Sequence, residues 1–197
     1  MRNRNIDIFI SGAGPAGLLA SLSFASLGYS VFCVDPKKPV TQSNEDGADL
    51  RTTAFLQPAK TFMVSLGLWE KLEPFAIPME IMRIIDSEGD NWPPRETTAK
   101  DFLASEISDL PFGWNIPNWL LRRTLLENAM EYSNLELEFG LTTSSIIRRD
   151  DAAFVYLNDG SQIKSKLIIG ADGRDSLVRD KSQIKISKRE FSQKALT

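Results

Sequence analysis

The segment 6–17 contains the feature that most restricts what this chain can fold into. A short apolar run leads at once into glycines spaced as G-x-G-x-x-G, and a helical run, a second apolar run and an acid follow. The acid stands about twenty residues beyond the glycines, which is the spacing of a dinucleotide-binding strand–turn–helix–strand unit. The sequence therefore predicts a Rossmann-like unit here. Its parts are the run 6–10, Gly12, Gly14 and Gly17, the helical run 18–27, the run 29–34, and Asp35.

Each residue of this motif has a separate expected role. Gly12 makes the tight turn, Gly14 leaves room for a pyrophosphate, and Gly17 lets the helix pack closely. The helix start, which includes Ala16, offers free N–H groups and the positive end of the dipole to the phosphates. Asp35 can accept hydrogen bonds from ribose hydroxyls and would repel a 2′-phosphate, so FAD or NAD is expected rather than NADP. The alternative, a glycine turn that only packs tightly, does not explain the acid.

Composition narrows the chemistry that the chain can perform. The 197 residues carry 23 basic and 26 acidic side chains with no long basic block, so nucleic acid is not an expected partner. Histidine is absent, which excludes Ser-His-Asp and Cys-His catalysis and the usual zinc sites. Cys33, the one cysteine, is expected in the core, without an intrachain disulfide. No apolar run approaches a membrane span, so we expect a cytoplasmic protein whose chemistry comes from a cofactor.

The remaining pattern predicts alternating helices and strands with one polar loop. The hairpin signal is strongest at 158–160, where Asn-Asp-Gly separates two apolar runs. The expected elements are a loop at 36–49, helices at 58–66, 68–72 and 118–132 with Asn118 as N-cap, strands at 79–86, 97–103, 135–139, 144–148, 154–157 and 162–169, and a turn at 87–90.

A second acid follows another apolar run. The run 166–170 is typical of a buried strand and leads into Asp172 and Gly173. Ligands of doubly wound sheets bind at the carboxyl ends of the strands, so we expect Asp172 to reach the same nucleotide as Gly14. The alternative is an Asp-Gly turn with no contact to a ligand.

Taken together, these segments resemble the flavin-dependent aromatic-ring hydroxylases of the para-hydroxybenzoate hydroxylase type. The segment 49–54, Asp-Leu-Arg-Thr-Thr-Ala, with Leu-Gly-Leu-Trp at 66–69, is similar to the family segment whose arginine, here Arg51, contacts FAD. The segment 170–179 is similar to the family Asp-Gly motif, which is linked to FAD and NAD(P)H binding through Asp172 and Gly173. Asn118 corresponds to the first residue of a family helix that touches FAD. The ubiquinone-biosynthesis hydroxylases look most similar.

The resemblance implies an α/β fold: a Rossmann-like FAD-binding domain of that type with an incomplete substrate-domain sheet. The implied boundaries are 1–76 and 118–182 for the FAD-binding domain, and 77–117 and 183–197 for a partial substrate domain. No later Gly-Asp motif of the family has a match here, so the chain looks like an N-terminal part.

The implied reaction is hydroxylation of a polyprenylated phenol, in which NAD(P)H reduces FAD and one oxygen atom passes to the ring. The implied setting is cytoplasmic, peripheral to the inner membrane, in a biosynthetic complex. Three alternatives stay open: a FAD- or NAD-binding module without turnover, an NAD-dependent dehydrogenase, and a remnant that binds nothing.

Overall fold

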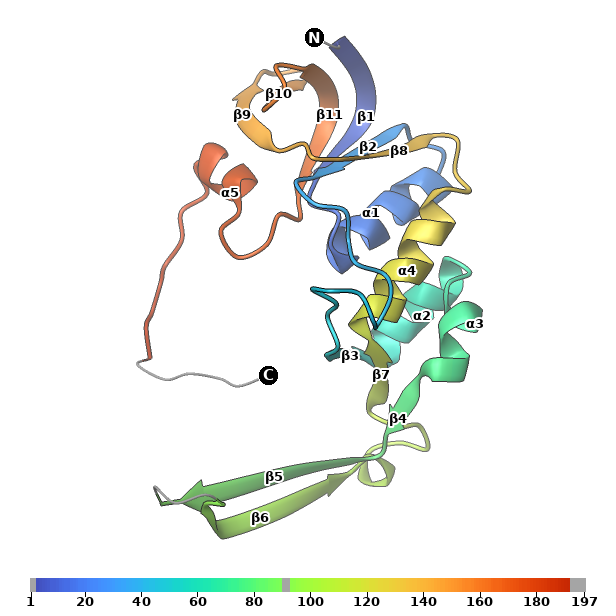
Figure 1. Ribbon diagram of the computed structural model, residues 1–197, viewed down its shortest axis with the longest axis vertical. Helices are drawn as coiled ribbons and strands as arrows, with labels where there is room; N and C mark the ends of the chain where they lie inside the picture. Colours follow the sequence, from blue (N-terminus) through green and yellow to red (C-terminus); the bar gives the residue numbers. More distant parts are fainter. Residues whose placement is uncertain (1–2, 90–92, 192–197) are drawn as a thin grey trace. The chain divides into compact units, whose positions relative to one another are not determined.

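The computed structural model describes residues 3–89 and 93–191, and the chain divides into two compact units (Figure 1). The larger unit comprises residues 1–51 and 119–197, and the smaller unit comprises 52–118. Residues 52–76, which we assigned to the FAD-binding domain from the sequence, lie in the smaller unit. The division into cofactor and substrate domains stays a prediction.

A six-stranded sheet, in the order β8-β2-β1-β11-β10-β9, forms the centre of the larger unit. Its first four strands are parallel, and β10 and β9 continue it in antiparallel pairing. The runs 6–10 and 29–34, predicted as parts of a Rossmann-like unit, are parallel to each other and to the strand predicted at 166–170. Ile8 pairs with Val31 on one side and with Leu167 on the other. The strands are β1 (Asn3–Ser11), β2 (Val31–Asp35), β8 (Leu135–Phe139), β9 (Thr143–Arg148), β10 (Ala153–Leu157) and β11 (Gln162–Gly170).

The position of β1 and β2 in the core of this unit explains why both strands consist of consecutive apolar residues. Phe9 and Phe32 lie on one face and are almost completely buried, while Ile10 and Cys33 on the other face are equally buried. A parallel strand that is covered on both faces needs apolar residues at every position. The expected burial of Cys33 is confirmed, and its exposed fraction is 0%.

Helices complete the larger unit. Helix α1 (Pro15–Ser26) packs on β1 and β2 through Leu18 and Leu22, and its proline at the first position suits a helix start (Figure 1). Helix α4 (Asn118–Ala129) begins at Asn118 itself, so the residue expected as N-cap is the first helical residue. The short α5 (Leu177–Lys181) follows β11, and the loop expected at 36–49 is irregular.

The carboxyl end of β11 is less covered than the rest of the strand. Its pairing with β10 reaches only to Ser165, so in the described chain the rest of the strand pairs with β1 alone. Leu167 is consequently 45% exposed, whereas Ile163, in the doubly paired part, is fully buried. An apolar run predicts a strand here but not how much of it is covered.

The smaller unit consists of short elements and a long hairpin. Its three-stranded antiparallel sheet, in the order β3-β7-β4, was not expected, and the strand expected at 79–86 is divided between β4 and β5. Of the turn expected at 87–90, residue 90 lies outside the described residues. The elements are β3 (Thr52–Leu56), α2 (Gln57–Ser65), α3 (Trp69–Leu72), η1 (Glu73–Phe75), β4 (Ile77–Met79), β5 (Ile81–Glu88), β6 (Arg95–Leu103), η2 (Ala104–Glu106) and β7 (Gly113–Pro117).

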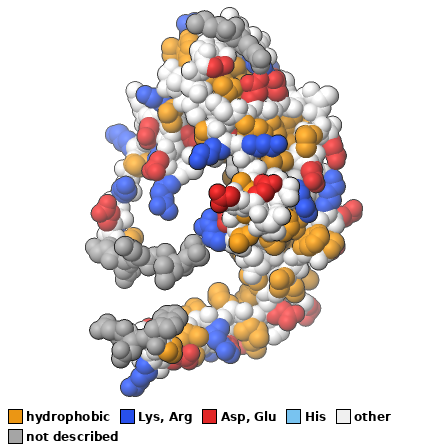
Figure 2. Space-filling view, viewed as in Figure 1, with side chains coloured by type: hydrophobic (Ala, Val, Ile, Leu, Met, Phe, Trp, Pro, Cys, Tyr) orange, Lys and Arg blue, Asp and Glu red, His pale blue; other side chains and the backbone are white. Residues whose placement is uncertain are grey.

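The hairpin of β5 and β6 carries a row of exposed apolar side chains. Ile81 and Ile84 are more than half exposed, as is Met82, and orange side chains reach the surface along the hairpin (Figure 2). By contrast, Trp69 is buried and meets Trp114 edge-on at 5.4 Å between ring centroids. Among the described residues, no helix has both the length and the apolar character needed to cross a membrane.

Candidate FAD site

The turn after β1 is built so tightly that its first glycine cannot be replaced without strain. The N–H of Gly12 donates to the carbonyl of Val34 at 2.7 Å, which fixes the turn against β2. The φ angle of Gly12 is +104°, a conformation that side chains rarely allow. A Cβ at this position would also lie 2.3 Å from the carbonyl oxygen of Ala171. Gly12 therefore lets the chain after β11 approach the chain after β1.

The other two glycines are required for different reasons. A Cβ on Gly17 would lie only 1.8 Å from the carbonyl oxygen of Gly12, so Gly17 allows the helix to pack on its own entry turn. Gly14, the N-cap of α1, has φ −69° and ψ 177°, which any residue can adopt, and no atom lies within 4 Å of its missing Cβ. The absent side chain of Gly14 leaves open space in front of the helix N-terminus.

This open space belongs to a cleft of about 350 Å³ in the larger unit. The cleft lies at the carboxyl ends of the parallel strands, where α1 presents its N-terminus, as the sequence motif predicts. Helix starts of this kind attract phosphates through unpaired N–H groups and the helix dipole. Five of the predicted site residues line the cleft together: Gly12, Gly14, Asp35, Asp172 and Gly173.

Asp35 braces the glycine turn as well as lining the cleft. Its Oδ2 accepts from the N–H of Ala13 at 2.8 Å, and its Oδ1 accepts from the N–H of Lys37 at 2.8 Å. A carboxylate offers about four acceptor positions, so each oxygen keeps capacity for a ligand hydroxyl. The bond to Ala13 could not be predicted from the motif, which indicates only the ribose contact.

Asp172 has a carboxylate oxygen that a bound cofactor could contact. Its Oδ2 accepts from the N–H of Val178 at 3.0 Å and so holds the start of α5. Its Oδ1 is buried and has no hydrogen-bond partner in the part of the chain that the structure describes. A buried acceptor without a partner is unusual in a folded protein. A hydroxyl or N–H group of a ligand in the cleft would satisfy it, so these residues fit a dinucleotide.

Four predicted site residues do not line the cleft, namely Ala16, Gly17, Arg51 and Asn118. Ala16 is exposed on the first turn of α1. Asn118 is buried in the smaller unit, where its Oδ1 accepts from the hydroxyl of Thr53 at 2.6 Å. Arg51 does not line the cleft, and its side chain is 60% exposed. The contact of Asn118 and Arg51 with a cofactor stays a prediction.

A carboxylate that we did not expect holds Arg51. Nε and Nη2 of Arg51 donate to the two oxygens of Asp49 at 2.8 and 3.0 Å, and this hydrogen bonding raises the pKa of Arg51. Asp49 also accepts from Nη2 of Arg122 on α4 at 3.2 Å. Asp49 and Arg122 are therefore positioning residues for Arg51.

The smaller unit contains a separate, mainly apolar cavity of about 770 Å³. Leu56 and Met79 line it beside Phe112, and Asn115 contributes a polar group. Cavities of this size and character typically hold small organic molecules. The described residues contain no group of His, Cys, Asp or Glu side chains that could hold a metal ion.

Known proteins with related sequences include hydroxylases of ubiquinone biosynthesis as well as other hydroxylases and monooxygenases. The 3-demethoxyubiquinol 3-hydroxylase of Escherichia coli is 25% identical over 196 residues, which is 100% of this chain and 48% of that protein. The ubiquinone hydroxylase UbiL of Rhodospirillum rubrum is 27% identical over 96% of this chain and 42% of its own length. The chain thus spans less than half of these relatives.

Comparison with solved structures identifies the fold. The flavin-dependent monooxygenase PieE, solved with FAD and substrate, has a TM-score of 0.74 at 21% identity and covers 93% of this chain and 33% of its own. The family described as "FAD binding domain" matches residues 5–195. Because this match includes nearly the whole sequence, the chain belongs to the FAD-binding domain family and has the α/β fold of the flavin-dependent monooxygenases.

Proposed function

We propose that the protein is an FAD-dependent monooxygenase that hydroxylates a polyprenylated phenol in ubiquinone biosynthesis. The observation that carries this proposal is the cleft in which the glycine turn, Asp35 and Asp172 converge at the start of α1. The relatives named as ubiquinone hydroxylases support the choice of substrate class. Because the chain spans less than half of those relatives, the activity is proposed for the protein to which the chain corresponds.

In this proposal the larger unit binds the cofactor. The N–H groups at the start of α1 would hold the pyrophosphate above Gly14, and Asp35 would accept from the ribose hydroxyls. The unpaired Oδ1 of Asp172 would accept from a further hydroxyl or N–H group of FAD. When bound, FAD supplies the redox chemistry, with NAD(P)H as the electron donor. Arg51, held by Asp49, and Asn118 are the residues proposed to complete the contacts.

The smaller unit is proposed to provide part of the substrate site. The apolar lining of its cavity suits the ring and prenyl tail of such a substrate, and Asn115 could accept from or donate to a phenolic hydroxyl. Docking to a biosynthetic complex at the cytoplasmic periphery of the inner membrane belongs to the same proposal. The exposed apolar residues of the hairpin, such as Ile81 and Ile84, are available for further packing.

A second candidate function is a FAD- or NAD-binding module without turnover. The observation that favours it is the match of the family described as "FAD binding domain" to residues 5–195, which concerns cofactor binding alone. In this alternative the cleft binds a nucleotide as proposed, and no substrate is hydroxylated.

One experiment separates these functions. The purified chain is titrated with FAD. Substrate-stimulated NADPH oxidation and hydroxylated product are then measured, with a polyprenyl phenol, on the FAD-loaded protein to which the chain corresponds. Flavin binding with product formation supports the monooxygenase, and flavin binding without oxidation supports the module. Weaker binding in Asp172→Asn, which keeps one oxygen to accept from the N–H of Val178, at an unchanged melting temperature would assign the cleft. Failure to bind any nucleotide would contradict both functions.

A further inference from the structure

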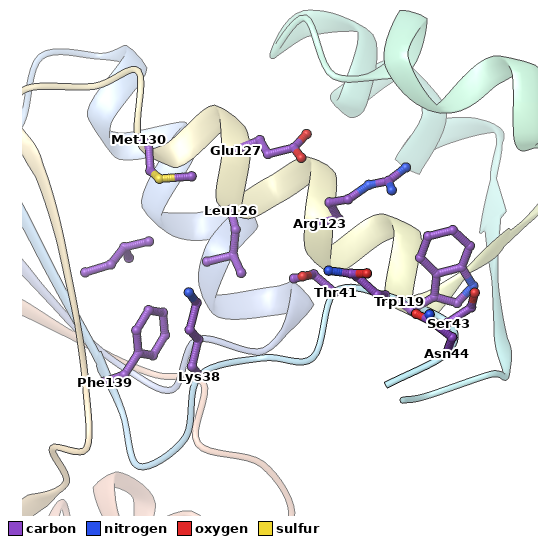
Figure 3. A pocket seen from close by; sticks show the side chains of 12 residues that line it. Lys38, Thr41, Ser43, Asn44, Trp119, Arg123, Leu126, Glu127, Met130 and Phe139 are labelled. Atoms are coloured by element: carbon purple, nitrogen blue, oxygen red, sulfur yellow. The ribbon is translucent and has the colours of Figure 1, made fainter. Parts of the chain in front are cut away.

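A second cavity in the larger unit has no role in the proposed FAD site. It measures about 600 Å³ and lies between the loop that follows β2, the outer face of α4 and the edge strand β8 (Figure 3). None of the residues that line it lines the cleft at the glycine turn. Its volume is within the range of sites that bind small organic ligands.

The inner wall of this cavity is apolar because of the alternation along β8. Leu137 and Phe139 face the cavity, together with Leu126 of α4, which is 7% exposed. The intervening residue of the strand, Glu138, points to the other side, where it forms an ion pair with Arg4 at 2.7 Å. A strand whose alternate residues face opposite sides thus offers a purely apolar strip to the cavity.

One positive charge faces this apolar strip. Lys38 extends from its loop toward α4 on the side where Phe139 and Leu126 lie (Figure 3). Its ammonium group has neither a hydrogen bond nor an ion pair with any residue that the structure describes. A lysine can lay its stem along an apolar surface and present the charge at its end. Lys38 therefore places an unpaired positive charge beside this apolar strip.

The other charges of the cavity are directed elsewhere. The guanidinium of Arg123 lies over the ring of Trp119, 5.2 Å from its centroid, and Arg123 and Glu127 extend from α4 away from Lys38 (Figure 3). The lining charges are Lys38, Arg123 and Glu127, which leaves one positive charge in excess. Thr41, Ser43 and Asn44 supply hydroxyl and amide groups at the end nearer Trp119.

We propose that this cavity is a binding site for a planar aromatic carboxylate. The ring would lie on Leu126, Leu137 and Phe139, and the carboxylate would accept from Nζ of Lys38. The aromatic side chains at both ends favour a flat ring, since aromatic pairs gain contact energy beyond area burial. A single negative charge matches the single excess positive charge. The proposal does not depend on the function proposed for the FAD cleft.

The test uses 2-naphthoate as the probe, measured by titration calorimetry on the chain with and without FAD. A neutral compound with the same ring, 2-naphthalenemethanol, and inorganic phosphate separate the contributions of ring and charge. Lys38→Met removes the cation and keeps the stem, and Lys38→Arg restores a cation. Lys37→Met is the matched control, because the adjacent side chain does not line the cavity.

We expect 2-naphthoate to bind equally well with and without FAD. Binding should be about tenfold weaker in Lys38→Met and for the neutral alcohol, the scale of one hydrogen bond to a charged group. Lys38→Arg and Lys37→Met should bind like the unchanged chain, and phosphate alone should not bind.

Four results would overturn the proposal. They are the absence of 2-naphthoate binding, equal binding of the alcohol, an equal loss in Lys37→Met, and competition between FAD and 2-naphthoate. The last would make the cavity part of the cofactor site. Thermal unfolding of each variant checks that the exposed substitutions leave the fold unchanged.

Discussion

Two glycines of the same motif should respond in opposite ways to substitution. Gly14 has ordinary backbone angles and open space around its missing Cβ, whereas a Cβ on Gly17 would lie 1.8 Å from the carbonyl oxygen of Gly12. We predict that Gly14→Val leaves the fold intact and abolishes FAD binding. Gly17→Ala should instead destabilise the fold itself.

The magnitudes follow from these environments. Replacing the N-cap glycine at Gly14 lowers the free energy of unfolding by about 0.5–1 kcal/mol. The lower entropy of the unfolded chain raises the free energy of unfolding by about 0.4–1 kcal/mol, which offsets this loss. The net change in unfolding free energy should stay within about 0.5 kcal/mol, or about 1–2 °C in melting temperature. Blocking two charge-assisted bonds to the pyrophosphate removes about 3–6 kcal/mol of binding, at least about a hundredfold in affinity.

In Gly17→Ala, unlike Gly14→Val, the new side chain cannot avoid a close contact. Both atoms of the close contact, the new Cβ and the carbonyl oxygen of Gly12, are fixed by the backbone, so the helix or the turn must shift. Overpacking of this kind costs about 3 kcal/mol, which corresponds to a fall of about 6–12 °C in melting temperature.

The assay combines thermal unfolding by circular dichroism with FAD titration by flavin fluorescence, on the unchanged chain and both variants. Unchanged FAD affinity in Gly14→Val would refute the assignment of open space at Gly14 to the pyrophosphate. An unchanged melting temperature in Gly17→Ala would refute the packing argument.

The remaining predictions concern one acid of the cleft, the buried thiol and a surface carboxylate. Asp35→Ala should weaken FAD binding about 10- to 100-fold in the same titration, since it removes hydrogen bonds to a charged group, and undiminished affinity would contradict that role. Burial raises the pKa of Cys33 to about 12, so a thiol reagent should react at pH 8 only after denaturant is added, and rapid labelling of the folded chain would contradict its burial. Hydrogen bonds from Lys166 and from Ser30 hold the pKa of Asp7 well below its usual range, so its contribution to stability is present above about pH 4 and is lost as the pH falls further. Asp7→Asn should therefore lower the melting temperature at pH 7, and the difference should shrink in acid; a difference that is constant from pH 7 to pH 2 would exclude this linkage.

The parts of the structure that depend on local pattern could be predicted from the sequence. Strands that are buried on both faces have continuous apolar sequences, which predict the strands directly. The turn between β1 and α1 requires glycine at Gly12 and Gly17, so the glycine spacing predicts the turn and the start of the helix. Because parallel strands place their carboxyl ends at one edge of the sheet, the sequence also predicted that Asp35 and Asp172 lie in one cleft.

Features that depend on distant partners could not be predicted. Strands β3 and β7 have no strong periodicity and form because they pair with each other; a Cβ on Gly113 would lie 2.4 Å from the carbonyl oxygen of Phe55. The ion pair of Asp49 with Arg122 joins residues that are 73 positions apart in the sequence. The exposure of Leu167 depends on how far β10 extends, which the apolar run itself does not indicate.

The most direct test of the central claim is a crystal structure of this chain with FAD bound. We predict the pyrophosphate within about 2.7–3.2 Å of the N–H groups at the start of α1, in front of Gly14, with a ribose hydroxyl donating to Asp35. We also predict a donor from FAD on Oδ1 of Asp172. FAD bound elsewhere, such as in the cavity beside Lys38 and Phe139, or a glycine turn without contact to the phosphates, would contradict the claim.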